Sequence, residues 1–219
     1  MLSVPTFFWT HPSTFTDSDS IEAAPLEGFQ PELYGGNWQV AYKTPTWFED
    51  GTSLMDACSP TLQNDSEATY DILDASPLML NIENRLLDPK TQALEYRITG
   101  TAWIVINDND ATDATGVLSK RLELSVLFNN ACSNRGTYRI VAYGNLPIES
   151  VGRRSEYTYA IVTGRTAAYI WVLVRDVDDL IRDENLRFLQ GVISRTLGRH
   201  ADALRPTPRM RYGVIHMYI

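Results

Sequence analysis

Few residues of this 219-residue chain have the types and spacing that catalysis or metal binding requires. His11, His200 and His216 stand far apart, and neither they nor the cysteines have the spacing of a zinc site. The sequence has no Gly-x-Ser-x-Gly segment and no glycine-rich phosphate loop. It therefore predicts no metal centre, no nucleophilic triad and no bound cofactor.

Aromatic residues at alternate positions form a stronger pattern. Trp38 and Tyr42 share one face of an extended segment, and Tyr169 and Trp171 share one face of another. Such rings contact apolar molecules, and a tyrosine hydroxyl needs a hydrogen-bond partner where it is buried. A pocket with a few polar groups accommodates these residues better than a solid core, which is the alternative.

The overall composition argues against several classes of partner. The formal charge is -8, and both duplex DNA and anionic lipid call for a basic surface. No apolar run is long enough to form a transmembrane helix. Residues 1–20 lack the charged and apolar regions of a signal peptide, and a signal removed earlier would leave no trace in them.

Eight segments are rich in β-branched and aromatic residues and end at turn residues, which is typical of strands. The connections DASP at 74–77 and TGRT at 163–166 have the chemistry of hairpin turns. The expected strands are 36–43, 66–74, 78–87, 94–106, 119–128, 137–144, 157–164 and 168–175.

One segment has the period of an amphipathic helix. Leu186, Leu189, Ile193 and Leu197 recur at spacings of three and four, and Gly198 suits the C-cap. Sequential strands followed by one helix predict an all-β fold: an eight-stranded antiparallel up-and-down β-barrel with one C-terminal α-helix packed outside. The expected parts are an N-terminal arm at 1–33, partly packed on the barrel, the barrel plus helix at 34–204, and a C-terminal tail at 205–219.

The first expected strand carries a known motif. In YGGNWQVAYKTPTWFE, residues 34–49, Gly36, Trp38 and Lys43 fall without a gap on the Gly-x-Trp signature of the lipocalins, in the form of the bacterial lipocalin and apolipoprotein D branch. Over about residues 34–204 the chain resembles that branch, which implies a cup-shaped barrel, or calyx, for a small ligand. The other matching segments are ATYDI at 68–72, TGTAW at 99–103 and YAIVTG…AYIWVLVR at 159–175.

The resemblance implies structural roles for Gly36, Trp38 and Arg175. In the family the counterpart of Trp38 closes the narrow end of the barrel, and the counterpart of Arg175 lies over its indole. Residues on the same strand faces as this pair are then expected to point inward. The candidate ligand-binding residues are Tyr42, Trp103, Tyr159, Tyr169 and Trp171. Alternation leaves open the orientation of Trp103 and Tyr159, and that of the further candidates Tyr96, Phe128 and Tyr138.

The two ends of the barrel raise separate expectations. Residues 144–157 depart from the second lipocalin signature, and Tyr157 alone corresponds to it. At the opposite, open end, the topology places Cys58 and Cys132 in loops on the same rim, so a Cys58–Cys132 disulfide is expected, with two free thiols as the alternative. The disulfide would imply a secreted protein that has lost a signal peptide, and free thiols would fit the cytoplasm. Asn64 begins a glycosylation sequon.

The expected function is the binding of a small hydrophobic molecule, such as a lipid, a terpenoid or a polyketide-like compound, inside the barrel. The alternative is a cofactor-independent natural-product cyclase of secondary metabolism, a pericyclase of the Diels-Alderase type, because some lipocalin-like proteins of microbial pathways are such enzymes. That chemistry needs shape, orientation and a hydrogen-bond donor on a carbonyl, not a nucleophile. No nucleic acid and no membrane span is expected, and the oligomeric state is not predicted. The candidate donors and contacts are Tyr42, Lys43, Arg97, Tyr169 and Trp171.

Overall fold

The protein is an antiparallel barrel in the computed structural model, which describes residues 20–44, 65–88, 90–104, 121–129, 135–148 and 156–210. Each strand pairs with the next, and β1 pairs with both β8 and β2, so that the sheet closes on itself. The expected eight-stranded antiparallel barrel is confirmed. Its strands are β1 Gly36–Lys43, β2 Asp65–Ala75, β3 Leu78–Leu87, β4 Leu94–Ile104, β5 Glu123–Phe128, β6 Arg135–Gly144, β7 Tyr159–Thr163 and β8 Ile170–Val174.

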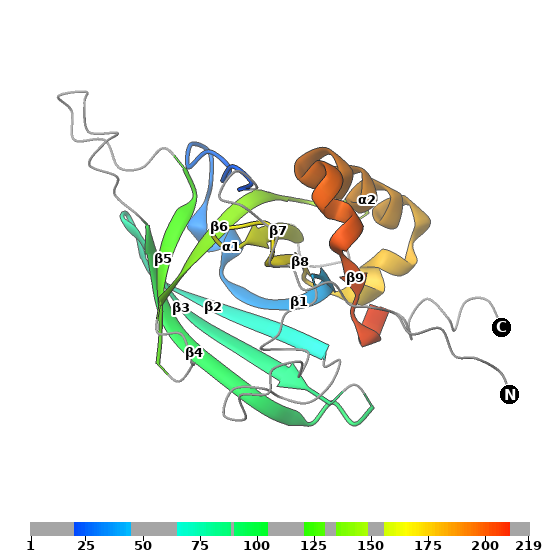
Figure 1. Ribbon diagram of the computed structural model, residues 1–219, viewed down its shortest axis with the longest axis horizontal. Coiled ribbons are helices and arrows are strands. Elements are labelled where there is room, and N and C mark those ends of the chain that lie inside the picture. The colour runs from blue at the N-terminus through cyan, green and yellow to red at the C-terminus, as the bar shows by residue number, and fades with distance from the viewer. Residues whose placement is uncertain are drawn as a thin grey trace, which may run out of the picture.

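The long helix α2, Asp183–Leu197, packs on the outside of the barrel, as expected (Figure 1). It buries Leu189, Ile193 and Leu197 and ends at Gly198, whose positive φ of 52° suits a glycine. Two 3₁₀ helices that were not predicted flank α2: η3, Val177–Ile181, and η4, Gly198–Ala203. None of the helices described is long and apolar enough to cross a membrane.

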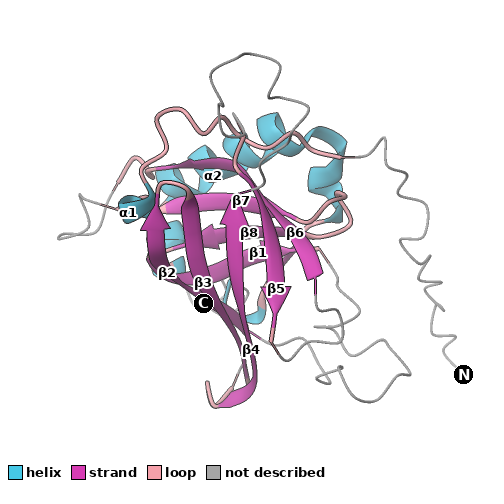
Figure 2. Cartoon of the chain, turned by 90° about the vertical axis from the view of Figure 1, so that its left-hand side faces the viewer, coloured by secondary structure: helices cyan, strands magenta, loops and turns pink. Residues whose placement is uncertain are grey.

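The apolar side chains form two clusters, one on each side of the barrel wall. The inner cluster contains Trp38, Val40, Ala102, Val126 and other residues that alternate along the strands. The outer cluster joins β6, β7, β8 and β1 to α2 and the segments around it. The second view shows α2 lying outside the barrel beside β7 (Figure 2). Strands β7 and β8, and the parts of β1 and β6 that contact the outer cluster, are therefore apolar on both faces.

An N-terminal segment closes one end of the barrel. The backbone N–H of Ala24 donates to the carbonyl of Ile140 at 2.8 Å, and the carbonyl of Ala24 accepts from Leu122 at 2.8 Å. The chain continues through Phe29, which is buried, to the short helix α1, Pro31–Tyr34, and then enters β1. Residues 24–34 thus cover the end at which β1 begins, and this is the closed end of the barrel.

A C-terminal segment completes the wall near the open end. Strand β1 pairs with β2 only from Gly36 to Gln39, and farther along it pairs with the short strand β9, Arg205–Pro206. The Thr207 hydroxyl donates to the carbonyl of Val40 at 2.9 Å, and the backbone N–H of Arg209 donates to Asp65 at 2.7 Å. The beginning of the expected tail therefore fills the space where β1 and β2 separate.

Several expected features lie outside the described residues, and their expectations stay predictions. These are the Cys58–Cys132 disulfide, the sequon at Asn64, His11, His216 and the side chain of Tyr96.

Candidate functional site

The floor of the barrel is built around Trp38 and Arg175. The guanidinium carbon of Arg175 lies 3.8 Å from the centroid of the Trp38 ring, which is the arrangement that the lipocalin resemblance implies. The indole N–H of Trp38 donates to the Tyr34 carbonyl at 2.9 Å. A Cβ on Gly36 would lie 3.3 Å from a guanidinium nitrogen of Arg175, and Gly36 has φ of 95°, so a side chain would be strained there.

Arg175 also holds the chain that enters the barrel. Its guanidinium donates to the carbonyl oxygens of Asn37 at 2.9 Å, Leu33 at 2.9 Å and Gly35 at 2.8 Å. It also donates to the carbonyl of Tyr157 at 2.9 Å. One side chain thus satisfies carbonyls of α1, β1 and the segment before β7, which would otherwise be buried without donors. Arg175 is therefore a structural residue of the closed end.

Three tyrosines from separate elements meet just inside this floor. Tyr34 ends α1, Tyr70 lies in β2 and Tyr138 lies in β6, and we call them the tyrosine cluster. The rings of Tyr34 and Tyr70 are stacked with centroids 5.3 Å apart, and Tyr70 meets Tyr138 edge to face at 5.8 Å. The hydroxyls of Tyr34 and Tyr138 share a short hydrogen bond. The cluster spans the interior from β2 to β6 and places its polar groups inside the barrel.

Burial keeps the hydroxyls of the tyrosine cluster protonated. It raises the pKa of Tyr70 to about 12, and it raises the pKa of Tyr34 and of Tyr138 well above the usual value. A phenolate is disfavoured there because the surrounding rings stabilise its charge less well than water does. These hydroxyls can therefore donate or accept hydrogen bonds at neutral pH, but they are poor general bases.

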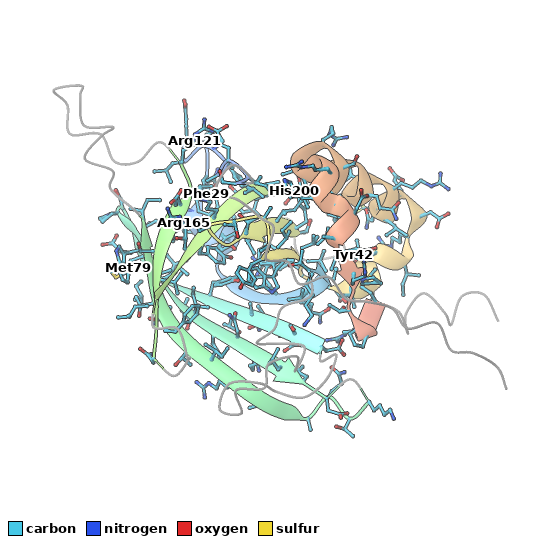
Figure 3. The ribbon with its side chains drawn as sticks, viewed as in Figure 1. Phe29, Tyr42, Met79, Arg121, Arg165 and His200 are labelled. Carbon is cyan, nitrogen blue, oxygen red and sulfur yellow. The ribbon has the colours of Figure 1, made fainter. Side chains whose placement is uncertain are left out.

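A β-bulge in β1 reverses the expected orientation of Tyr42. Val40 is opposite Leu173 of β8, but Tyr42 is opposite Val172, so the register shifts between Val40 and Tyr42. Tyr42 consequently packs against the outer cluster, and Figure 3 shows it near β9. The inward orientation expected for Tyr42 from simple alternation is wrong.

The same bulge turns Lys43 toward the interior. Lys43 is the register partner of Trp171, which packs against the inner cluster, and only 6% of the surface of Lys43 is exposed. The stem of a lysine packs readily on an aromatic ring, but its ammonium group is seldom so deeply buried. Lys43 is therefore one of two deeply buried charged residues described near the open end, the other being Asp65, which is 2% exposed.

The inner face near the open end combines rings with polar groups. The rings of Trp171 and Tyr169 are stacked with centroids 6.3 Å apart. Trp171 and Phe128 both pack against the inner cluster and remain partly exposed. Alternation from Ala68 and Ile82, both in the inner cluster, places Ser66 of β2 and Asn84 of β3 on the same face. We call Lys43, Ser66, Asn84, Phe128 and Trp171 the mouth residues.

Two further candidates point away from the interior. Trp103 is 39% exposed, because its neighbours Ala102 and Ile104 occupy the inner face of β4. Met79, its cross-strand neighbour, lies on the outer side of the strands (Figure 3). Tyr159 packs edge to face on Phe188 of α2, with centroids 5.9 Å apart. Trp103 and Tyr159, whose orientation alternation left open, therefore do not line the interior, and they are wrong as ligand-binding candidates.

The structure brings together only part of the expected lining. Trp171 faces the interior, Tyr169 stacks on it, and Phe128 and Tyr138 also contact the inner cluster. Sequence reasoning gave Tyr34 and Tyr70 no role, although Tyr34 directly precedes the Gly-Gly of the motif and Tyr70 alternates with Ala68. Among the described residues, no group of three His, Cys, Asp or Glu side chains is arranged to hold a metal ion.

Comparisons with known proteins add nothing to this geometry. No protein-family model and no curated protein matches the sequence. One similar solved structure is the tryptamine complex of the amine-binding protein of Rhodnius prolixus, with 10% identity, coverage of 89% of this chain and 92% of that chain, and a TM-score of 0.45. Another is a selenomethionine derivative of a biogenic amine-binding protein, with 9% identity, coverage of 91% and 94%, and a TM-score of 0.46. At these values neither likeness bears on the ligand of the present chain.

Proposed function

We propose that the protein binds one small, largely apolar molecule inside the open end of the barrel. One observation carries this proposal: the floor side chains Trp38 and Tyr34 are 0% exposed, whereas the inward-facing Trp171, Phe128 and Tyr138 remain partly exposed. A barrel that served only as a solid core would bury its inner face throughout. The difference supports an interior that is filled at the floor and accessible above it.

The chemistry of the accessible part favours an apolar ligand with a few polar atoms. Trp171 and Phe128 provide aromatic walls, and the tyrosine cluster provides hydroxyls at the bottom. This combination of apolar walls and few polar groups is typical of small-molecule sites. The resemblance to lipocalins supports the same function, and a lipid, a terpenoid or a polyketide-like compound would match this lining.

A neutral fluorescent probe, N-phenyl-1-naphthylamine, tests the proposal directly. We expect saturable binding of one molecule per chain, which Trp171→Ala weakens about tenfold through the loss of a buried aromatic contact. Trp103→Ala is the matched control, because it removes the same side chain from the outer wall and should leave the affinity unchanged. Absence of binding, or equal losses in both variants, would contradict the proposal.

A second candidate function is cyclisation of a bound polyene. The observation that favours it is the presence of hydrogen-bond donors on the inner face, namely the ammonium of Lys43 and the hydroxyl of Tyr138. A donor on a substrate carbonyl would lower the barrier of a pericyclic ring closure without a nucleophile. Incubation of a linear polyene with a small molar fraction of the protein distinguishes the functions, because only an enzyme forms product in excess of protein. Tyr138→Phe should then lower the rate.

A further inference from the structure

We infer that the ligand of the barrel presents an uncharged hydrogen-bond donor, most simply a hydroxyl group, to the tyrosine cluster at the bottom of the site. This inference rests on the proposed function, because it names the chemical class of the molecule that the same interior would bind. Three observations carry it: the hydrogen bonds among the three tyrosine hydroxyls, the exposure of the cluster toward the open end, and the charges that act on it.

The three hydroxyls of the tyrosine cluster are hydrogen-bond partners of one another. The hydroxyls of Tyr34 and Tyr138 share a short hydrogen bond, and the hydroxyl of Tyr70 forms hydrogen bonds with both. A hydroxyl has one hydrogen to donate and two lone pairs with which to accept. Mutual hydrogen bonds among three hydroxyls therefore engage every hydrogen but only half of the lone pairs. The cluster can accept a hydrogen bond from a ligand without breaking any bond of its own.

The tyrosine cluster is exposed on the side of Tyr138. Tyr34 and Tyr70 are 0% and 3% exposed, whereas Tyr138 is partly exposed, and the hydrogen bond between Tyr34 and Tyr138 is only partly buried. Gly136 is the next residue toward the open end on the same face of β6, and a Cβ there would lie 3.6 Å from the ring of Phe128. Because Gly136 brings no side chain into this space, a ligand at the open end can extend to the hydroxyl of Tyr138.

The charges that act on the cluster argue for an uncharged ligand group. Arg175 acts on the phenol of Tyr34, and it is itself paired with Glu156, which is 46% exposed, at 3.5 Å. Among the described residues, no carboxylate affects the pKa of any tyrosine of the cluster. An ammonium group at the cluster would therefore lose its hydration without gaining an anionic partner. A carboxylate group would bring only lone pairs to hydroxyls whose hydrogens are already engaged.

An uncharged donor meets both conditions. A ligand hydroxyl can donate to a spare lone pair of the Tyr138 hydroxyl while the hydrogen bonds of the cluster stay intact. A ketone or an ether brings only acceptors, so it would bind there only if the cluster gave up one of its own hydrogen bonds, and the loss would offset the gain. The apolar part of the ligand would extend past Phe128 and Trp171, so the ligand would enter the barrel with its hydroxyl group first.

A series of naphthalenes that differ in one substituent at the same ring position tests this inference. Naphthylmethanol, acetylnaphthalene, methylnaphthalene and naphthylmethylamine, which is an ammonium ion at neutral pH, would each compete with N-phenyl-1-naphthylamine for the full-length protein. The loss of probe fluorescence gives their affinities. We expect the alcohol to bind about fivefold more tightly than the ketone, since one net hydrogen bond is worth a factor of this order. The hydrocarbon and the ammonium compound should also bind more weakly than the alcohol.

Two variants locate the preference. Tyr138→Phe keeps the ring but removes the accessible lone pairs, and it frees a hydrogen that Tyr34 or Tyr70 had donated, so the alcohol should lose its advantage over the ketone. Tyr159→Phe is the matched control, because it removes a tyrosine hydroxyl on the outer side of the barrel and should leave the preference unchanged. The comparison of the four compounds in the wild-type protein stands even if Tyr138→Phe does not fold.

The outcomes separate this inference from the proposed function. Equal or tighter binding of the ketone, the hydrocarbon or the ammonium compound would overturn the assigned ligand class, and so would a preference for the alcohol that persists in Tyr138→Phe. In these cases the binding function stays in place, because the probe still binds. The same conclusion follows if the probe binds and none of the four compounds displaces it. If the probe does not bind and calorimetry detects none of the four compounds, both proposals are wrong.

Discussion

Lys43 of β1 and Trp171 of β8 are register partners, and both lie on the inner side of the barrel near its open end. Arg175 directly follows β8 at the opposite end of the barrel. Its guanidinium lies over the ring of Trp38. The inner face of this part of the wall thus carries a cation and an aromatic ring at each end. These are Arg175 and Trp38 at the floor, and Lys43 and Trp171 at the mouth.

Replacement of Arg175 should damage the fold more than the binding site. Arg175→Met removes the donors to the carbonyls of Asn37, Gly35 and Tyr157 and the contact with Trp38. We expect a loss of about 3 kcal/mol in the free energy of unfolding, because buried carbonyls lose their partners. Urea unfolding measures this loss. Arg121→Met, which removes a half-exposed arginine, is the control, and equal losses in the two variants would contradict the assigned role.

The tyrosine cluster should make the protein sensitive to alkali. Burial raises the pKa of Tyr70 from 10.0 in the unfolded chain to about 12 in the fold, so between these values the folded state retains a proton that the unfolded state has lost. The stability from this group is complete below pH 10 and falls as the pH rises toward 12, by on the order of 2 kcal/mol. Tyr70→Phe should flatten this fall. Urea unfolding at about pH 9 and about pH 11 checks the slope, and identical slopes in both proteins would refute the prediction.

Tyr159 should contribute to stability and not to ligand binding. Its ring packs on Phe188 of α2, so Tyr159→Ala leaves a cavity between the barrel and the helix. We expect a loss of about 3 kcal/mol on unfolding with an unchanged affinity for the naphthylamine probe. Thermal unfolding and probe titration on the same sample give both quantities. A tenfold weaker affinity in a folded variant would show that Tyr159 reaches the ligand after all.

Sequence patterns predicted the barrel because most strands alternate cleanly or carry a motif. The expected ranges 36–43 and 78–87 coincide with β1 and β3, and the helix from Asp183 ends at the predicted glycine. Turn residues and β-branched residues act locally, so these boundaries can be read from short stretches. Strand β9 could not be predicted in this way, since its two residues are held by a distant partner in β1.

The lining was harder to predict than the fold, for a physical reason. The strands under α2 are apolar on both faces, so alternation does not reveal which face is inner. Bulges in β1 and β6 then change which face of the strand the following side chains occupy, and no glycine or proline marks these bulges in the sequence. For these reasons Tyr42 was assigned to the wrong face, and the face of Tyr159 could not be assigned. The face of Trp103 could not be assigned because both faces of β4 carry large apolar side chains at its end.

The most direct measurement of the central claim is native mass spectrometry of the protein purified from the organism that produces it. We predict one small molecule per chain that is released unchanged on denaturation, is retained by Trp103→Ala, and is present at clearly lower occupancy in Trp171→Ala. An empty barrel in the wild-type protein, or equal retention of the molecule by both variants, would contradict a ligand site at the mouth.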